Sequence, residues 1–181
     1  SPDDAPWPGW LFYASTEMNP RNPIWHDAGA LNGYIARVQS VLQAGDPDND
    51  ILLYWPLYDV WHSDAGMNIN MTVHHRDWFE KFPVAALADK LWQRGWAFDF
   101  VSDRMLAGCQ ARRGDVVTAA GGRYRAIVVP ATAHMSVATV RKLAELAKAG
   151  VSVMYEGALP ADVPGWAKLD GTRAELKTSL N

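Results

Sequence analysis

The spacing of hydrophobic positions divides the chain into an irregular beginning and a regular remainder. Residues 1–28 show no hydrophobic period, are rich in Trp and Pro, and predict a loop. Apolar residues three and four positions apart then form one stripe, which is typical of a helix and ends at Gly45. The residues of this stripe are Leu31, Tyr34, Ile35, Val38, Val41 and Leu42.

A buried strand is predicted directly after this helix. Residues 51–55 are continuously apolar and are followed by Pro56, a pattern that indicates a strand covered on both faces. Residues 57–82 have no clear period and predict a second long loop. Pro83 in the first turn and Gly95 just beyond the last turn are typical of the two ends of a helix.

The second half of the chain continues the alternation. Gly121 and Gly122 predict a β-hairpin that leads into a buried strand at Ala126–Val129. Ser136 suits the N-cap of the most regular helix, whose apolar stripe consists of Val140, Leu143, Leu146 and Ala147. Weaker signals predict a strand at 96–102, a helical turn at 103–108, a strand at 151–157 and the start of a helix at 171–181.

The order of these elements predicts the fold class. From residue 51 onward it is strand, helix, strand, hairpin, strand, helix, strand, which argues for a parallel sheet with helices on both faces. We therefore expect an α/β domain of three-layer, flavodoxin-like type. Because no strand precedes the opening loop and the last helical pattern stops in mid-course, we expect the chain to be a piece of a longer protein.

Composition and charge exclude a few classes of partner. The 181 residues are 49% hydrophobic and 20% charged, enough for one full domain or for one domain and an appendage. The net charge of −3 gives no reason to expect nucleic acid as a partner. No apolar run approaches the roughly 18 residues of a membrane span, so we expect no membrane insertion. The single Cys109 excludes an internal disulfide framework.

Motifs that would carry catalysis are not evident. Both Gly-rich nucleotide-binding signatures are absent, and we expect no cofactor. The adjacent pair His74 and His75 suits loop histidines better than a metal site. Cys109 lacks the strand and the glycine-flanked turn of a nucleophile elbow, which favours a buried small residue. We therefore predict no metal site and no catalytic residue within this chain.

Acidic and aromatic side chains provide the candidate binding residues. Asp59, Asp103 and Glu156 follow predicted strand ends, where doubly wound sheets bind ligands but where carboxylates also cap helices. Aromatic rings interleaved with amides and charges suit a sugar, whose C–H face stacks on rings. The same rings could instead bury the loops against their own protein. The candidate substrate-binding residues are Trp7, Trp10, Glu17, Asn19, Arg21, Trp25, Asp59 and Trp61.

Residues 7–61 carry a resemblance to a known family. They are similar to the segment after the last barrel strand in glycoside hydrolase family 106, the α-L-rhamnosidase-like enzymes. The segments FDFVSDRML and YRAIVVPATAHMSVATVRKLAELAKAG resemble the flavodoxin-type domain of that family, which is like class I glutamine amidotransferases. The pattern that carries the first similarity consists of Tyr34, Ile35, Ala36, Arg37, Gln39, Leu42 and Gly45.

The resemblance implies a division of the chain and a function. Residues 1–45 would be the C-terminal loop and last helix of a (β/α)8 catalytic barrel, and residues 46–181 an amidotransferase-like domain truncated at its C-terminus. Its partners would be a carbohydrate substrate and the upstream barrel of the same polypeptide, which would hold the catalytic carboxylates. The full-length protein would be periplasmic or secreted and would hydrolyse terminal sugars from glycans or glycosides, while this piece alone would be inactive.

Two alternatives stay open at this point. The chain could be a non-catalytic interaction module of the kind that follows the barrel in β-galactosidase-type enzymes, where it helps to build homo-oligomers. It could also be a free-standing amidotransferase-like hydrolase that uses Cys109, which is the weaker alternative because the residues around the thiol lack a nucleophile elbow.

Overall fold

The computed structural model describes residues 4 and 18–180 and contains two compact units, Ser1–Asp46 and Pro47–Asn181. In the first unit, helix α1 spans Trp25–Ala44, so the prediction of a loop through residue 28 was wrong at its end. Side-chain oxygens of Asn19 and Asn22 accept hydrogen bonds from backbone N–H groups two residues later, and these turns lead into the helix.

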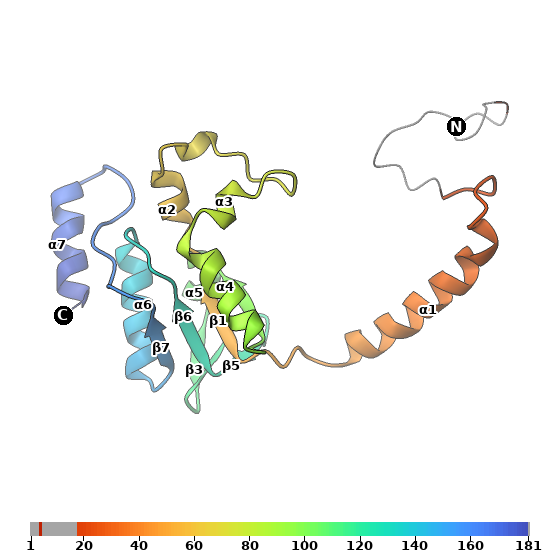
Figure 1. Cartoon of the computed structure of the whole chain (residues 1–181). Helices are drawn as coiled ribbons and strands as arrows, with labels where there is room; N and C mark the ends of the chain where they lie inside the picture. The colour runs from red at the N-terminus through yellow and green to blue at the C-terminus, as the bar shows by residue number, and fades with distance from the viewer. Residues whose placement is uncertain (1–3, 5–17, 181) are drawn as a thin grey trace. The chain divides into compact units, whose positions relative to one another are not determined.

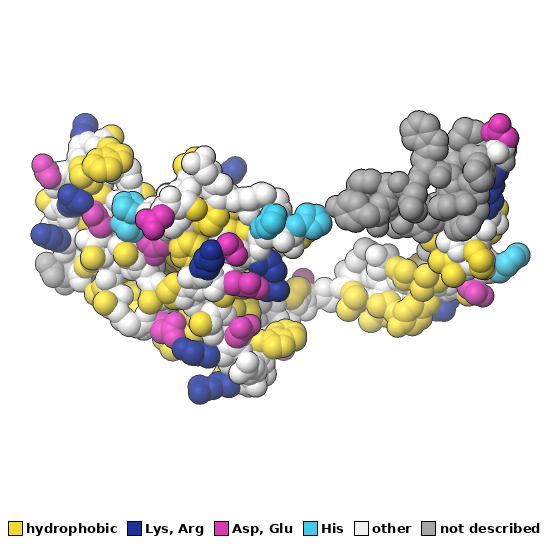
Figure 2. All heavy atoms as spheres, turned by 45° about the horizontal axis from the view of Figure 1, so that its top comes forward, with side chains coloured by type: hydrophobic (Ala, Val, Ile, Leu, Met, Phe, Trp, Pro, Cys, Tyr) yellow, Lys and Arg dark blue, Asp and Glu magenta, His cyan; other side chains and the backbone are white. Residues whose placement is uncertain are grey.

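The apolar stripe of α1 lies on the surface. Val41 and Leu42 expose 73% and 70% of their area, and Tyr34 exposes 60%. Hydrophobic side chains, yellow in Figure 2, follow the length of this helix. A helix normally buries such a stripe against another element, so the pattern is that of a helix with a packing partner.

The second unit is organised around a four-stranded parallel sheet in the order β2-β1-β6-β7 (Figure 1). Its strands are β1 Ile51–Tyr54, β2 Phe98–Val101, β6 Ala126–Val129 and β7 Ser152–Tyr155. The register pairs Ile51 with Phe98 on one side and with Ala126 on the other. All four residues of β1 and of β6 are buried, which confirms the prediction of strands covered on both faces.

Helices cover both faces of this sheet because alternate strand residues point in opposite directions. Leu53 and Val128 pack with α4, Pro83–Gln93, through residues such as Val84. The opposite face packs against α6, Val137–Lys148, which Ser136 caps by accepting a hydrogen bond from the backbone N–H of Thr139. The predicted α/β class with a parallel sheet is confirmed. The short helix α5, Asp103–Ala107, and the C-terminal helix α7, Leu169–Leu180, pack on the same side as α6.

A small antiparallel sheet adjoins the parallel one. It consists of β3 Gln110–Arg112, β4 Asp115–Val117 and β5 Arg123–Tyr124. The predicted hairpin joins β4 to β5. A second tight turn, at Arg113 and Gly114, joins β3 to β4 and was not predicted. Both turn residues have positive φ, 53° and 87°. Gly114 suits this conformation, but Arg113 is unusual in it, so the pair does not match the Asn-Gly, Asp-Gly or Gly-Gly turns that indicate a hairpin.

Residues 57–82 are more regular than the predicted loop. They contain α2 Leu57–His62, the 3₁₀ turn η1 Gly66–Asn68 and α3 Asp77–Glu80. Each is too short to show a hydrophobic period and is held by tertiary contacts instead. In α3, the ring of Phe79 stacks on Trp55 with centroids 5.6 Å apart, and Val60 of α2 is fully buried.

Candidate functional site

Two loops meet at the carboxyl edge of the parallel sheet. Because β1 and β6 run in parallel, the segments that follow Tyr54 and Val129 emerge at the same edge. The first forms α2 and carries Asp59 and His62, and the second carries Thr132 and His134. The site is therefore built from residues more than seventy positions apart in the chain.

The carboxylate of Asp59 joins these two loops. One oxygen accepts hydrogen bonds from the hydroxyl of Thr132 at 2.5 Å and from the backbone N–H of Ala133 at 3.0 Å. The other accepts from the backbone N–H of His134 at 2.9 Å and lies 2.7 Å from its ring Nδ1, a distance that places a proton between them. These four contacts occupy the lone pairs of the carboxylate and fix the loop that follows β6.

The two histidines of the site are stacked. The rings of His62 and His134 lie 3.9 Å apart between centroids, with 17° between their planes. The side chains of His134 and Asp59 each expose 16% of their area, so both are shielded from solvent but not sealed from it. The Asp59 carboxylate holds the orientation of the His134 ring, and the stack extends that order to His62.

A shallow cavity of about 470 Å³ lies beside the stacked histidines, within the second unit. Trp166 exposes 86% of its area and Trp61 exposes 40%, although both are large apolar rings. The ring of Tyr58 meets Trp61 edge to face, with centroids 6.0 Å apart. The residues lining this aromatic pocket are Tyr58, Trp61, His62, Pro164, Gly165 and Trp166. Exposed rings around a concavity form a surface to which a flat apolar ligand face can bind.

The loop that presents Trp166 is anchored at Asp162. Asp162 accepts from Arg173 Nε of α7 at 2.8 Å, and its backbone oxygen accepts from the N–H of Met135 at 3.0 Å. Gly165 has φ 83°, a conformation that favours glycine at the turn before the ring. Trp166 therefore extends from a turn four residues after this anchor.

The remaining strand-end carboxylates are also engaged internally. Asp103 accepts from the hydroxyl of Tyr54 at 3.0 Å and from that of Thr139 at 2.5 Å. Burial, followed by the charge of Asp103, raises the pKa of Tyr54 well above its usual value, so the phenol stays protonated. Glu156 pairs with Lys90 Nζ at 2.9 Å. Each predicted acid thus has a structural partner. Asp59 binds loop groups, as expected of such carboxylates, whereas the N-caps of α2, α5 and α6 are other residues.

The aromatic residues divide into two groups. Trp55 stacks on Phe79, and Trp78 packs against Trp55 while donating a hydrogen bond to the backbone oxygen of Thr72 at 2.9 Å. These rings bury a loop against its own protein. The rings of Trp61 and Trp166 are instead open to solvent.

The predicted substrate-binding residues are distributed over both units. Trp7, Trp10 and Glu17 lie outside the described residues. Asn19, Arg21 and Trp25 belong to the first unit, where Trp25 begins α1 and exposes 41% of its area. Asp59 and Trp61 lie together on α2.

Sequence reasoning missed the contributions of Trp166 and His134 to this site. The proline–glycine pair directly before Trp166 marks a turn that presents a ring, and this was the signal available. For His134 no local pattern existed, because its partners are distant in sequence.

Other candidate chemistry is not supported by the geometry. Cys109 is 1% exposed, its thiol lies 3.4 Å from the backbone oxygen of Met105, and burial raises the pKa of the thiol. It is a buried small residue, as predicted, and not an accessible nucleophile. Among residues 4 and 18–180, no cluster of three His, Cys, Asp or Glu side chains could hold a metal ion. No helix in that part of the chain is long and apolar enough to cross a membrane.

Comparison with known proteins identifies the family. The model of the family Glyco_hydro_106, described as alpha-L-rhamnosidase, matches residues 1–180. The chain belongs to this glycoside hydrolase family.

A curated relative of this chain comes from Formosa agariphila and is named "Putative beta-glucuronidase". It is 27% identical over 167 residues, which cover 92% of this chain and 12% of the relative. The chain thus spans about an eighth of the length of that relative. The crystal structure of beta-galactosidase from Bifidobacterium adolescentis aligns with 73% of this chain and 53% of its own at 16% identity, with a TM-score of 0.43, too low to define the fold.

Proposed function

We propose that the chain is a segment of an α-L-rhamnosidase-like glycoside hydrolase and that it contributes sugar-contacting aromatics without hydrolysing the bond itself. The full enzyme removes terminal sugars from glycans or glycosides by carboxylate acid/base chemistry. The observation that carries the proposal is the aromatic pocket, where Trp61 and Trp166 are exposed beside polar groups at the ligand-binding edge of the sheet.

The residues of the pocket are better suited to binding a sugar than to hydrolysing a glycosidic bond. The two indoles offer flat apolar faces for sugar C–H groups, and the hydroxyl of Tyr58 and the ring nitrogens of His62 offer partners for sugar hydroxyls. Hydrolysis needs two available carboxyl groups flanking the bond. Asp59, the carboxylate on the same helix, is fully occupied by internal hydrogen bonds. It therefore acts by holding the pocket in shape, and the catalytic carboxylates lie elsewhere in the full protein.

The first unit fits the end of a catalytic barrel. Helix α1 carries an exposed apolar stripe that needs a packing partner, and a barrel sheet supplies such a surface. The preceding loop and the start of α1 would then face the active site. They would present to substrate Trp7, Trp10, Glu17, Asn19 and Arg21 from the loop and Trp25 from the helix. The flavodoxin-like, amidotransferase-like assignment of the second unit rests on its strand order, because the parallel strands follow the flavodoxin order 2-1-3-4. A secreted or periplasmic location and a homo-oligomeric state remain part of the proposal.

Calorimetric titration of the full 181-residue chain tests the pocket, because all its lining residues belong to the second unit. We expect saturable binding of L-rhamnose or a rhamnoside that Trp61→Ala and Trp166→Ala each weaken by about tenfold. Trp92→Ala is the matched control, since Trp92 exposes 76% of its area outside the pocket. We also expect no turnover of aryl rhamnosides.

Three outcomes would contradict the proposal. Turnover by this chain would mean that it holds the catalytic residues. Equal binding by all three Trp variants would remove the pocket as the sugar site, and no binding of rhamnose, galactose or glucuronate would favour the interaction-module alternative.

A further inference from the structure

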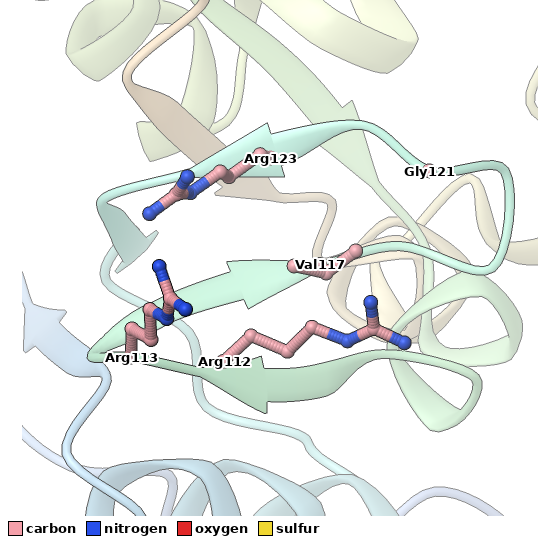
Figure 3. Close-up of a pocket in the computed structure, with 5 residues that line it drawn as sticks. All are labelled: Arg112, Arg113, Val117, Gly121 and Arg123. Carbon is pink, nitrogen blue, oxygen red and sulfur yellow. The ribbon is translucent and has the colours of Figure 1, made fainter.

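The antiparallel sheet carries a second exposed site, away from the aromatic pocket. A shallow cavity of about 580 Å³ lies over its outer face. The lining residues are Arg112, Arg113, Val117, Gly121 and Arg123 (Figure 3). The backbone N–H groups of Arg125 and Ala126, which follow β5, donate to the backbone oxygen of Asp50 just before β1. The antiparallel sheet therefore adjoins the amino end of β1, whereas the aromatic pocket lies beyond the carboxyl end of β1.

Strand alternation explains why Arg112 and Arg123 share one face, and Arg113 lies in the turn that follows β3. Val116 and Tyr124 point inward and belong to the hydrophobic core. Their neighbours therefore point outward, and Val117 of β4 is paired with Arg123 of β5 in the register. Figure 3 shows the side chains of Arg113 and Arg123 pointing toward one another, while that of Arg112 extends toward the end of the hairpin that carries Gly121.

Within the described part of the chain, the positive charge of this face is only partly neutralised. Arg123 pairs with Asp115 at 2.5 Å, and Asp115 is the one carboxylate of this sheet. Among the described residues, neither Arg112 nor Arg113 forms an ion pair. Two unpaired guanidinium groups beside a third repel one another, and an anion would relieve this repulsion by accepting paired N–H donors.

Arg113 adds a local argument for function. Its φ of 53° lies in the left-handed region, where Gly, Asn or Asp are favoured at a two-residue hairpin turn. An Arg at this position costs stability and brings a guanidinium to the rim of the cavity. Strained residues of this kind concentrate at ligand-binding positions.

We propose that this arginine face binds the acidic groups of an anionic polysaccharide, a carboxylate or sulfate carried on a sugar unit. A glycan is the favoured class because the chain belongs to a glycoside hydrolase family, and a net charge of −3 disfavours a nucleic acid. The cavity has the volume of a site for one or two sugar units. The arginine face would hold a charged part of the polymer away from the bond being cleaved, and it does not depend on the aromatic pocket.

Titration of the full chain with α-1,4-trigalacturonate tests the proposal. We expect saturable binding at low salt that weakens as salt is raised, and at least about tenfold weaker binding of the fully methyl-esterified trisaccharide. Comparing the binding of a sulfated disaccharide with that of inorganic sulfate distinguishes recognition of a sulfated sugar from recognition of a free anion. Binding of hexaglutamate as tight as that of the trisaccharide would overturn the proposal in favour of an acidic protein segment.

Substitutions locate the site. We expect Arg112→Gln to weaken trigalacturonate binding about tenfold with unchanged stability, while the control Arg104→Gln, exposed on α5, has no effect. Arg113→Gly should weaken binding similarly while unfolding at an equal or higher temperature, because Gly adopts the left-handed turn without strain. Equal weakening by Arg104→Gln, or no saturable binding of either acidic sugar by the unmodified chain, would overturn the proposal.

Discussion

Replacing Asp59 with Asn tests whether its carboxylate holds the loop that carries His134. The substitution keeps size and shape but exchanges one acceptor oxygen for an NH₂ group. Because each oxygen accepts from one backbone N–H, either orientation of the amide loses the bond from Ala133 or the bond from His134. The carboxylate receives four hydrogen-bonding contacts and exposes 16% of its side chain, so much of its solvation comes from this loop. Asp59→Ala removes all four contacts at once.

The expected cost follows from these contacts. A hydrogen bond to a charged group contributes about 1.5–3 kcal/mol, and bonds to one carboxylate are not additive. We therefore expect Asp59→Ala to lower the free energy of unfolding by about 3 kcal/mol and Asp59→Asn by about 1.5 kcal/mol. For a chain of this size, 3 kcal/mol corresponds to a fall of about 6–12 °C in the melting temperature.

Thermal and urea denaturation followed by circular dichroism measure this effect. Asp64→Asn is the matched control, because Asp64 follows α2 and is exposed, and its replacement should change stability by less than about 0.5 kcal/mol. If Asp59→Asn proves as mild as Asp64→Asn, the carboxylate does not hold the loop. Asp59 would then be available to a ligand, as the sequence suggested.

Three further predictions concern the core and its titrating groups. In urea denaturation, Leu53→Ala should lower the free energy of unfolding by about 3 kcal/mol, because Leu53 is fully buried on the central strand. Leu42→Ala should lower it by less than about 1 kcal/mol, because Leu42 exposes 70% of its area. Equal losses would refute the assigned core. Burial, then the hydrogen bond to Asp99, raises the pKa of Tyr124 to about 12. The unfolded chain therefore loses this proton first as pH rises through 10, so stability should fall between pH 10 and 12, and Tyr124→Phe should make that fall shallower; an unchanged slope would count against the shift. The buried thiol of Cys109 should react with an aromatic disulfide reagent at pH 8 only when urea unfolds the chain, and rapid reaction of the native protein would show that it is accessible.

Elements that carry their own signal could be predicted from the sequence. Strand β1 is a run of four apolar residues, and helix α6 has an N-cap and an apolar stripe at helical spacing. These local patterns are sufficient to indicate a strand and a helix, and both were predicted correctly. The short helices could not be predicted, because they carry no such pattern. Helix α2 has six residues, too few for a period, and its conformation depends on the burial of Val60 and on the contacts of Asp59.

The candidate sites depended on tertiary structure to a greater degree. The sequence determined that aromatic residues collect in irregular segments, but it could not tell Trp55, which packs internally, from Trp61, which is exposed. Only the parallel pairing of β1 with β6 brings Asp59 to His134, and only the loop before α7 brings Trp166 to Trp61. The physical reason is that hydrophobic periods report which face of an element is buried, whereas partners distant in sequence are selected by strand order and packing.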